Sequence, residues 1–131
     1  MLNSRSLIVP VVAAVICAMN PLTATAEEVL GKGNFTGKSG HKTSGSVSIV
    51  KTDTGIEVRL GSNFKLDGAP DPWLGFGNSR KYDSAGEIAI LKSNKGPQVY
   101  KVAGNIDASK YNEFYVWCRK FAMPLGVAKL K

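Results

Sequence analysis

Apolar and polar residues alternate along several short stretches of the chain, most clearly in two neighbouring ones. In SVSIVKT (46–52) and IEVRLGSNF (56–64), apolar residues fall at alternate positions, which is typical of a strand with one buried face. The intervening TDTG (52–55) contains Asp and Gly, which tolerate or supply the backbone angles of tight turns. The pattern therefore predicts a β-hairpin over residues 46–60.

Short strands separated by Gly, Pro, Asn and Asp continue towards the C-terminus. Further strands are predicted at 87–93, 98–104, 113–121 and 126–130, with a shorter one around Trp73–Phe76 and a turn or single helical turn at 105–112. No segment has an apolar period of 3.6. This order predicts an all-β protein, a single small antiparallel β-sandwich or barrel-like domain.

Two segments lack a strand pattern. Residues 31–45 are Gly-rich and polar, with Phe35 as the one clear anchor, and residues 66–86 contain two prolines and four glycines. Gly and Pro exclude a helix from the second segment. We expect both segments to be mainly loops around the short strand at Trp73–Phe76.

The segment EFYVWCRKF is the most β-prone run of the sequence. Alternation puts Phe114, Val116 and Cys118 on one face of this strand, and large residues such as Tyr115 and Trp117 on the other. Both faces carry large apolar groups, which predicts a central strand that is covered on both sides. The first face is the better candidate for the core, so we expect Cys118 to be inward or partly buried.

The N-terminus has the pattern of a secretory signal peptide. A 13-residue uncharged apolar run (7–19) precedes the small-x-small motif Ala24-Thr25-Ala26, and the run is shorter than the roughly 20 residues of a membrane-spanning helix. Cleavage after Ala26 would remove Cys17. We expect a signal peptide at 1–26 and an exported, periplasmic or extracellular, β domain at 27–131.

Charge limits the choice of partners. The sequence has 17 basic and 10 acidic residues, and loss of Arg5 with the signal peptide leaves 16 against 10, a net charge of +6. The basic residues are scattered, as on a solvated surface, but their excess favours an acidic redox partner protein or an anionic envelope component. Export and the lack of a basic stripe interleaved with aromatics argue against nucleic acid. The expected mature chain has no second apolar segment long enough to span a bilayer.

The inventory of ligands restricts the chemistry of Cys118. The sequence has one histidine, His41, and after cleavage one methionine, Met123. A zinc site needs about four ligands, a blue-copper site needs two His and a Cys, and the C-x-x-C-H motif of covalent haem is absent. Non-covalent haem needs only one or two axial ligands, and Cys, His and Met all qualify. Haem, a lone redox thiol or a purely structural cysteine remain.

Four other residues are weaker candidates for a pocket around Cys118, and each also has an ordinary structural interpretation. His41 would otherwise be an exposed loop residue, and Met123 a packed residue at the end of a strand. Trp117 would otherwise be a packing residue, and Asp71 a turn residue. A nucleophilic pair of Cys118 and His41 is allowed by number, but nothing orients the two and no third group is evident. The sequence therefore favours a protein that is not an enzyme.

The segments GNFTGKSGHKTSGSVSIV, NFKLDGAPDPWLGF, LKSNKGPQVYKV and IDASKYNEFYVWCRKFAMPLGVAKL together resemble the DM-thirteen domain. This is a small exported domain that is often found beside DOMON and other electron-transfer modules. The resemblance runs from about Gly33 to Leu130, and its most specific part is Trp117-Cys118 followed by Gly126. The chain departs from the family pattern at Pro72, a residue that fits an edge or the start of a strand.

The resemblance implies a β-sandwich-like domain with a role in extracytoplasmic redox chemistry or electron transfer. It makes Cys118 the candidate redox thiol or haem-iron ligand. The alternative is a non-enzymatic binding or adhesion module of the cell envelope, in which Cys118 is structural.

Overall fold

The computed structural model describes Pro10 and residues 27–131; the rest of the predicted signal peptide, with Cys17, lies outside the described residues. The described part contains ten strands and one short 3₁₀-helix, η1. The strands are β1 (Glu28–Gly37), β2 (Thr43–Ser44), β3 (Ser46–Thr52), β4 (Gly55–Leu60), β5 (Lys65–Leu66), β6 (Pro72–Asn78), β7 (Lys81–Ile90), β8 (Gln98–Lys101), β9 (Glu113–Cys118) and β10 (Met123–Lys129). In this part of the chain no helix is long and apolar enough to cross a membrane.

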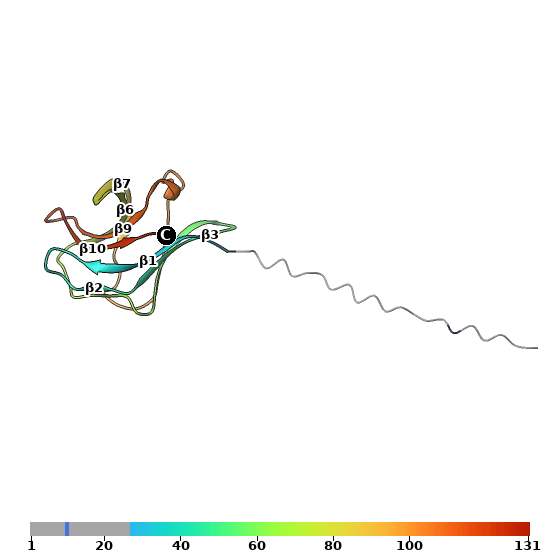
Figure 1. Cartoon of the computed structure of the whole chain (residues 1–131), viewed down its shortest axis with the longest axis horizontal. Helices are drawn as coiled ribbons and strands as arrows, with labels where there is room; N and C mark the ends of the chain where they lie inside the picture. Colours follow the sequence, from blue (N-terminus) through green and yellow to red (C-terminus); the bar gives the residue numbers. More distant parts are fainter. Residues whose placement is uncertain (1–9, 11–26) are drawn as a thin grey trace, which may run out of the picture.

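Eight strands form one antiparallel sheet in the order β7-β6-β9-β10-β1-β3-β4-β8, and β2 pairs with β5. The sheet curls into a half-barrel (Figure 1). Its two edges approach each other, where the backbone N–H of Lys92 donates to the hydroxyl of Tyr100 at 3.0 Å. The prediction of an all-β, antiparallel, barrel-like domain is confirmed.

The predicted hairpin is present as β3 and β4. Val47 pairs with Leu60 and Ile49 with Val58, and all four side chains are buried. The turn places Gly55 at φ +130°, a left-handed conformation that Gly adopts without steric cost. The 105–112 segment likewise contains a single helical turn, η1 (Ala108–Lys110), whose first residues are capped by the Asp107 side chain.

The main feature that sequence reasoning missed is β1. It joins the two halves of the sheet, with β10 on one side and β3 on the other. Its glycines hid the strand pattern, and they are needed there because neighbouring backbone lies very close. A Cβ added at Gly33 would sit 2.1 Å from the carbonyl oxygen of Lys129, and one at Gly37 would sit 2.1 Å from that of His41.

Two other strands differ in length from their predictions. β7 begins at Lys81, inside the segment expected to be a loop, and β9 ends at Cys118 rather than at residue 121. The chain turns back directly after Cys118 through Ala122, which has φ +49°. β6 begins at Pro72, as the missing N–H of proline favours.

Aromatic rings fill the inside of the half-barrel. Phe114 of β9 lies between Phe76 and Phe35, with ring centroids 5.1 and 6.3 Å away, and Phe35 meets Phe64 edge-on at 5.5 Å. These contacts join residues that are far apart in the sequence. The core therefore holds the curled sheet in shape through side chains from strands on both sides of β9.

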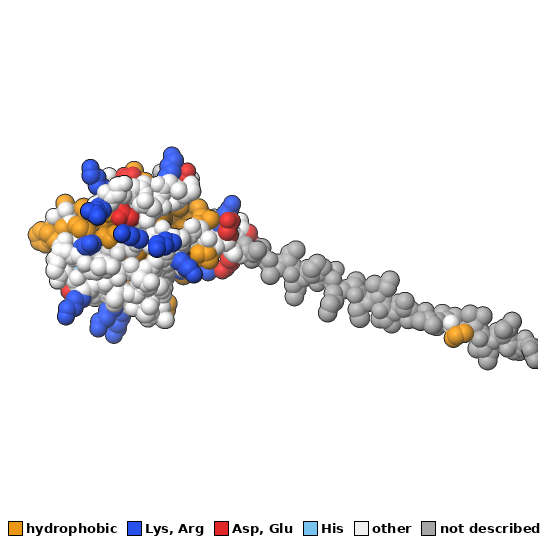
Figure 2. All heavy atoms as spheres, in the orientation of Figure 1, with side chains coloured by type: hydrophobic (Ala, Val, Ile, Leu, Met, Phe, Trp, Pro, Cys, Tyr) orange, Lys and Arg blue, Asp and Glu red, His pale blue; other side chains and the backbone are white. Residues whose placement is uncertain are grey.

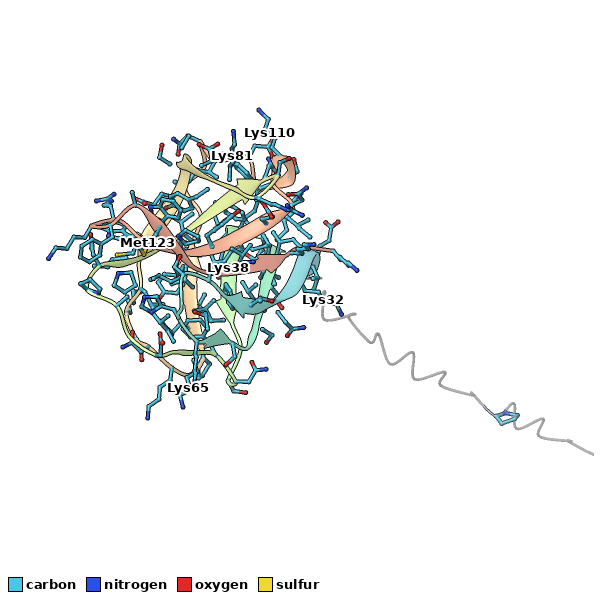
Figure 3. All side chains as sticks on the ribbon, turned by 60° about the vertical axis from the view of Figure 1, so that its left-hand side comes forward. Lys32, Lys38, Lys65, Lys81, Lys110 and Met123 are labelled. Carbon is cyan, nitrogen blue, oxygen red and sulfur yellow. The ribbon has the colours of Figure 1, made fainter. Side chains whose placement is uncertain are left out.

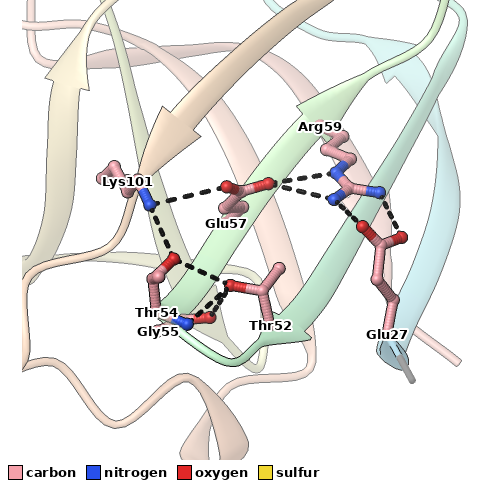
Figure 4. A network of polar contacts seen from close by, with 7 residues as sticks. All are labelled: Glu27, Thr52, Thr54, Gly55, Glu57, Arg59 and Lys101. Carbon is pink, nitrogen blue, oxygen red and sulfur yellow. Dashed lines mark hydrogen bonds and ion pairs between the residues drawn. The ribbon is translucent and has the colours of Figure 1, made fainter. Parts of the chain in front are cut away.

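Ion pairs tie the beginning of the described domain to the outside of the sheet (Figure 4). The Arg59 guanidinium donates to both carboxylate oxygens of Glu27 at 2.9 and 2.7 Å and also to Glu57. Lys101 of β8 lies 3.6 Å from Glu57. The hydrogen bond to Arg59 and the charge of its guanidinium lower the pKa of Glu27 from its usual value.

Candidate functional site

Cys118 is the last residue of β9 and is 1% exposed. It shares the inner face with Phe114 and Val116, which are fully buried. On the opposite face Tyr115 is also buried and Trp117 is half-buried. The predictions of an inward cysteine and of a strand covered on both sides are therefore confirmed.

The two neighbouring strands place Met123 and Pro72 beside Cys118. Met123, the first residue of β10, and Pro72, the first residue of β6, are its cross-strand partners. Directly opposed residues of an antiparallel pair project from the same face, so the thiol and the Met123 thioether point the same way. They are the only sulfur-bearing side chains of residues 27–131.

Cys118 is enclosed by the apolar core. It lines neither the wide groove nor the smaller hollow on the surface of the described domain. No group of three or more His, Cys, Asp or Glu side chains that could hold a metal ion occurs among the described residues. This environment suits a protected thiol, and in this arrangement it offers no space for a haem beside the sulfur.

His41 is held by an acidic residue instead of facing Cys118. Its Nδ1 lies 2.9 Å from a carboxylate oxygen of Asp67, whose other oxygen accepts the backbone N–H of Lys42 at 3.0 Å. These hydrogen bonds, with that from Lys42 the larger influence, lower the pKa of Asp67 from its usual value. Among the described residues no hydrogen bond or ion pair joins His41 to Cys118.

Asp71 organises the chain just beyond Cys118. Its carboxylate accepts the indole N–H of Trp73 at 2.8 Å, and its carbonyl oxygen accepts the backbone N–H of Arg119 at 3.0 Å. The Arg119 guanidinium then lies over the Trp73 ring, 3.6 Å from its centroid. Asp71 thus fixes the positions of Trp73 and of Arg119, the residue that follows the cysteine, on the outer face of the sheet.

Trp117 belongs to a group of side chains that we call the outer aromatic cluster, made up of Trp73, Tyr82, Tyr115 and Trp117. Tyr82 of β7 stacks on Trp117 with a centroid distance of 4.4 Å and an interplanar angle of 6°. The same ring meets Tyr115 edge-on at 5.7 Å. Trp73 and Trp117 are direct cross-strand partners, so the cluster extends over three strands.

Two glycines of β6 make room for this cluster. A Cβ at Gly75 would lie 2.7 Å from the Tyr82 ring, and one at Gly77 would lie 2.6 Å from the Tyr115 ring. The outer face of β6 is thus bare beyond Trp73, and the two tyrosines lie across it. The GFG sequence at 75–77 is part of the construction of the cluster.

Both tyrosine hydroxyls of the cluster donate to carboxylates. Tyr82 donates to Oε2 of Glu87 at 2.5 Å, and Tyr115 donates to Oε1 of Glu113 at 3.1 Å. Burial and, next, the hydrogen bond to Glu87 raise the pKa of Tyr82 far above its usual value; burial and the Glu113 charge raise that of Tyr115 to about 12. Both phenols therefore stay protonated at neutral pH.

A wide groove borders the cluster at Tyr115. It is lined by residues of β1, β3, β9 and β10 and has a volume of about 1190 Å³. Five cationic side chains line it: Lys32, Lys38, Arg80, Lys129 and Lys131. Glu113 is the one acidic residue in its lining, and that carboxylate is already engaged by Tyr115 and the backbone N–H of Arg80.

The sequence did not show that residues of β7 join Tyr115 and Trp117 in this cluster. Alternation placed Tyr115 and Trp117 on one face, but Tyr82 and Glu87 come from a strand that was expected to begin only at residue 87. The sequence signal that could have indicated the cluster is the pair of glycines around Phe76. Two glycines on one face of a strand leave space that large side chains of neighbouring strands can fill.

These features define a small antiparallel half-barrel in which one thiol is buried at the end of an inner strand of the sheet, β9. A family model described as "Electron transfer DM13" matches residues 34–130. The chain therefore belongs to the DM13 electron-transfer family, as the resemblance implied. The searches of curated proteins and of solved structures found no match.

Proposed function

We propose that the protein is an exported electron-transfer domain in which Cys118 is the redox-active group, acting as a thiol without a metal. The observation that carries the proposal is the position of Cys118, buried at the end of β9 with Met123 as its cross-strand partner. Membership of the electron-transfer family supports a redox role. The signal-peptide pattern of residues 1–26 supports export to the periplasm or the extracellular space.

Burial determines how such a thiol would operate. A buried sulfur is protected from bulky oxidants and from disulfide exchange, because those reactions need direct access to the sulfur. A small oxidant such as peroxide can still reach a sulfur that bulky reagents cannot, and electrons can cross a thin layer of protein. A one-electron partner docked near Pro72 and Met123 would take one electron from the sulfur without covalent contact. The S–H bond breaks in the same step and its proton leaves to solvent, and the return of one electron and one proton restores the thiol.

The experiment compares the wild type with Cys118→Ser in two measurements. In the thiol form of the proposal, the folded wild type is oxidised by peroxide at Cys118 while it reacts slowly with a bulky maleimide, and Cys118→Ser is inert to both. A thiol that reacts with neither reagent in the folded protein would contradict this form.

Haem ligation by Cys118 is the alternative form, and it requires the turn after β9 to open. Added haem would then give a shifted Soret band in the wild type that Cys118→Ser abolishes. An unchanged haem spectrum in the wild type would exclude this form.

A second candidate function is binding to an anionic envelope component, and the observation that favours it is the groove with five cationic side chains. Figure 2 shows many Lys and Arg side chains gathered on one face of the domain. An acidic redox partner would fit the same surface, so the two functions are compatible.

Vesicles with anionic lipid headgroups test this candidate. The double variant Lys32→Gln/Lys129→Gln removes two groove cations, whereas Lys65→Gln/Lys95→Gln removes the same charge elsewhere; Lys65 projects from the end of the domain opposite Lys81 and Lys110 (Figure 3). Binding should fall with salt and be lost only in the groove variant. Salt-independent binding, or equal losses in both variants, would count against the groove.

A further inference from the structure

The outer aromatic cluster combines oxidisable rings with proton acceptors. Tyr82 and Trp117 are stacked at 4.4 Å, and the Tyr82 hydroxyl already donates to Glu87. Loss of an electron makes a phenol strongly acidic, so a carboxylate in hydrogen-bond contact can take up its proton in the same step. By contrast, no hydrogen bond to the Cys118 sulfur occurs within the described domain.

We propose that the Tyr82–Trp117 stack is a second, one-electron redox site, in which Glu87 accepts the phenolic proton of Tyr82. The stack lies on the face of β9 opposite Cys118, so the proposal does not depend on the role assigned to the cysteine.

The reaction partner is a high-potential one-electron metal oxidant. The oxidant gains one electron, the O–H bond of Tyr82 breaks, and the proton forms an O–H bond on Oε2 of Glu87. The products are a neutral tyrosyl radical, a neutral Glu87 carboxylic acid and the reduced metal. Return of one electron from a reductant moves the proton back to Tyr82, and Trp117 can share the radical because its ring is in stacking contact.

Arg119 directs the oxidation to Tyr82 and Trp117 instead of Trp73. Its guanidinium lies 3.6 Å from the centre of the Trp73 ring, and a cation at that position opposes the positive charge of an oxidised indole. Arg119 also forms an ion pair with the other oxygen of Glu87. This contact keeps the carboxylate facing Tyr82 and opposes its protonation, so Arg119 helps to set the potential of the site.

The cluster can be reached from two sides. Tyr115 lines the cationic groove, while Tyr82 lines a smaller hollow together with Lys81 and Tyr111. Tyr82 contacts both Tyr115 and Trp117. A metal centre carried on an acidic surface and docked in the groove would thus lie next to the first ring of a short chain of aromatic groups.

The test generates a ruthenium(III) polypyridyl oxidant with a light flash and follows tyrosyl and tryptophanyl radicals by transient absorption and electron paramagnetic resonance. Tyr82→Phe removes the phenol and keeps the stacked ring. Tyr111→Phe is the matched control, because Tyr111 also donates to a carboxylate, Asp83 at 2.7 Å, but stacks on Phe76, which is not oxidisable under these conditions.

We expect a tyrosyl signal in the wild type and in Tyr111→Phe that is lost or replaced by a tryptophanyl signal in Tyr82→Phe. Glu87→Gln should slow radical formation at least about tenfold, or ~1.4 kcal/mol of activation free energy, because the amide is a far weaker base. It should also change the rate ratio between H₂O and D₂O. Circular dichroism and thermal melting confirm that each variant is folded, and Glu87→Gln retains every aromatic ring should Tyr82→Phe fail to fold.

Equal radical yields in the wild type and Tyr82→Phe, or an unchanged rate and isotope effect in Glu87→Gln, would overturn the proposal. Cys118→Ser should leave the radical signals intact, which separates this site from the proposed function of the cysteine. A tyrosyl signal that disappears in Cys118→Ser would contradict the independence of the two sites.

Discussion

At the scale of single residues, Cys118 differs from an ordinary buried cysteine by its neighbours rather than by its exposure. Free cysteines are often buried and behave as small apolar side chains, so burial alone does not separate a redox thiol from a packing residue. The feature that sets Cys118 apart is its pairing with Met123, the other sulfur-bearing side chain of residues 27–131. Sequence alternation predicted the inward direction of the sulfur.

The packing around Cys118 predicts the stability of two variants. Cys118→Ser should lower the free energy of unfolding by about 1–3 kcal/mol because a hydroxyl would face an apolar core. Cys118→Ala, which introduces no polar atom, should cost less. Chemical denaturation of both variants measures the difference, and a serine variant as stable as the wild type would show that the sulfur lies in a polar or open site.

At the scale of elements, the sequence predicted the strands in which apolar and polar residues alternate. It did not predict the strand in which glycines interrupt this alternation. β3, β4 and β9 were predicted from their apolar positions. β1 was not, because neighbouring backbone lies so close to Gly33 and Gly37 that no side chain fits there. β7 was shortened in the prediction because its first half is polar and supports the outer face. The outer aromatic cluster depends on two features that the alternation of apolar residues does not reveal. These are the glycines at positions 75 and 77 of β6 and the polar first half of β7.

The close contact at Gly33 predicts the effect of a single added methyl group. Gly33→Ala would place Cβ 2.1 Å from the carbonyl oxygen of Lys129, and the backbone shift needed to relieve this overlap should cost about 1–3 kcal/mol. Gly104→Ala is the control, since a Cβ there has nothing within 4 Å. Thermal melting of both variants tests this, and equal melting temperatures would mean that β1 and β10 separate easily.

At the scale of the whole molecule, the curl of the sheet creates two different faces. The inner face holds the aromatic core and Cys118, and the outer face carries the cationic groove and the aromatic cluster. The sequence predicted the fold class and the excess of positive charge. It could not predict that lysines from β1 and β10 line one groove, because that depends on the order of strands in the sheet.

Carboxylates on the surface of the whole domain predict how its stability depends on pH. Hydrogen bonds lower the pKa values of Glu27, Asp67, Asp83 and Asp107 in the folded protein. Since the folded-state pKa values lie below the unfolded ones, this stabilisation is complete above about pH 4.5 and is lost as the pH falls through the folded-state values.

Urea denaturation between pH 3 and 7 measures this loss. Asp67→Asn should make the free energy of unfolding less dependent on pH below about pH 4, because the variant lacks a carboxylate whose pKa is lowered by folding. Stability that rises as the pH falls through this range would contradict the assignment.

We propose that this domain transfers electrons through Cys118, and direct electrochemistry of the purified protein tests this role. We expect a reversible wave for the wild type that is lost in Cys118→Ser and retained in the matched surface variant Lys65→Gln. A wave of the same potential and size in Cys118→Ser, or no wave in the folded wild type, would contradict it.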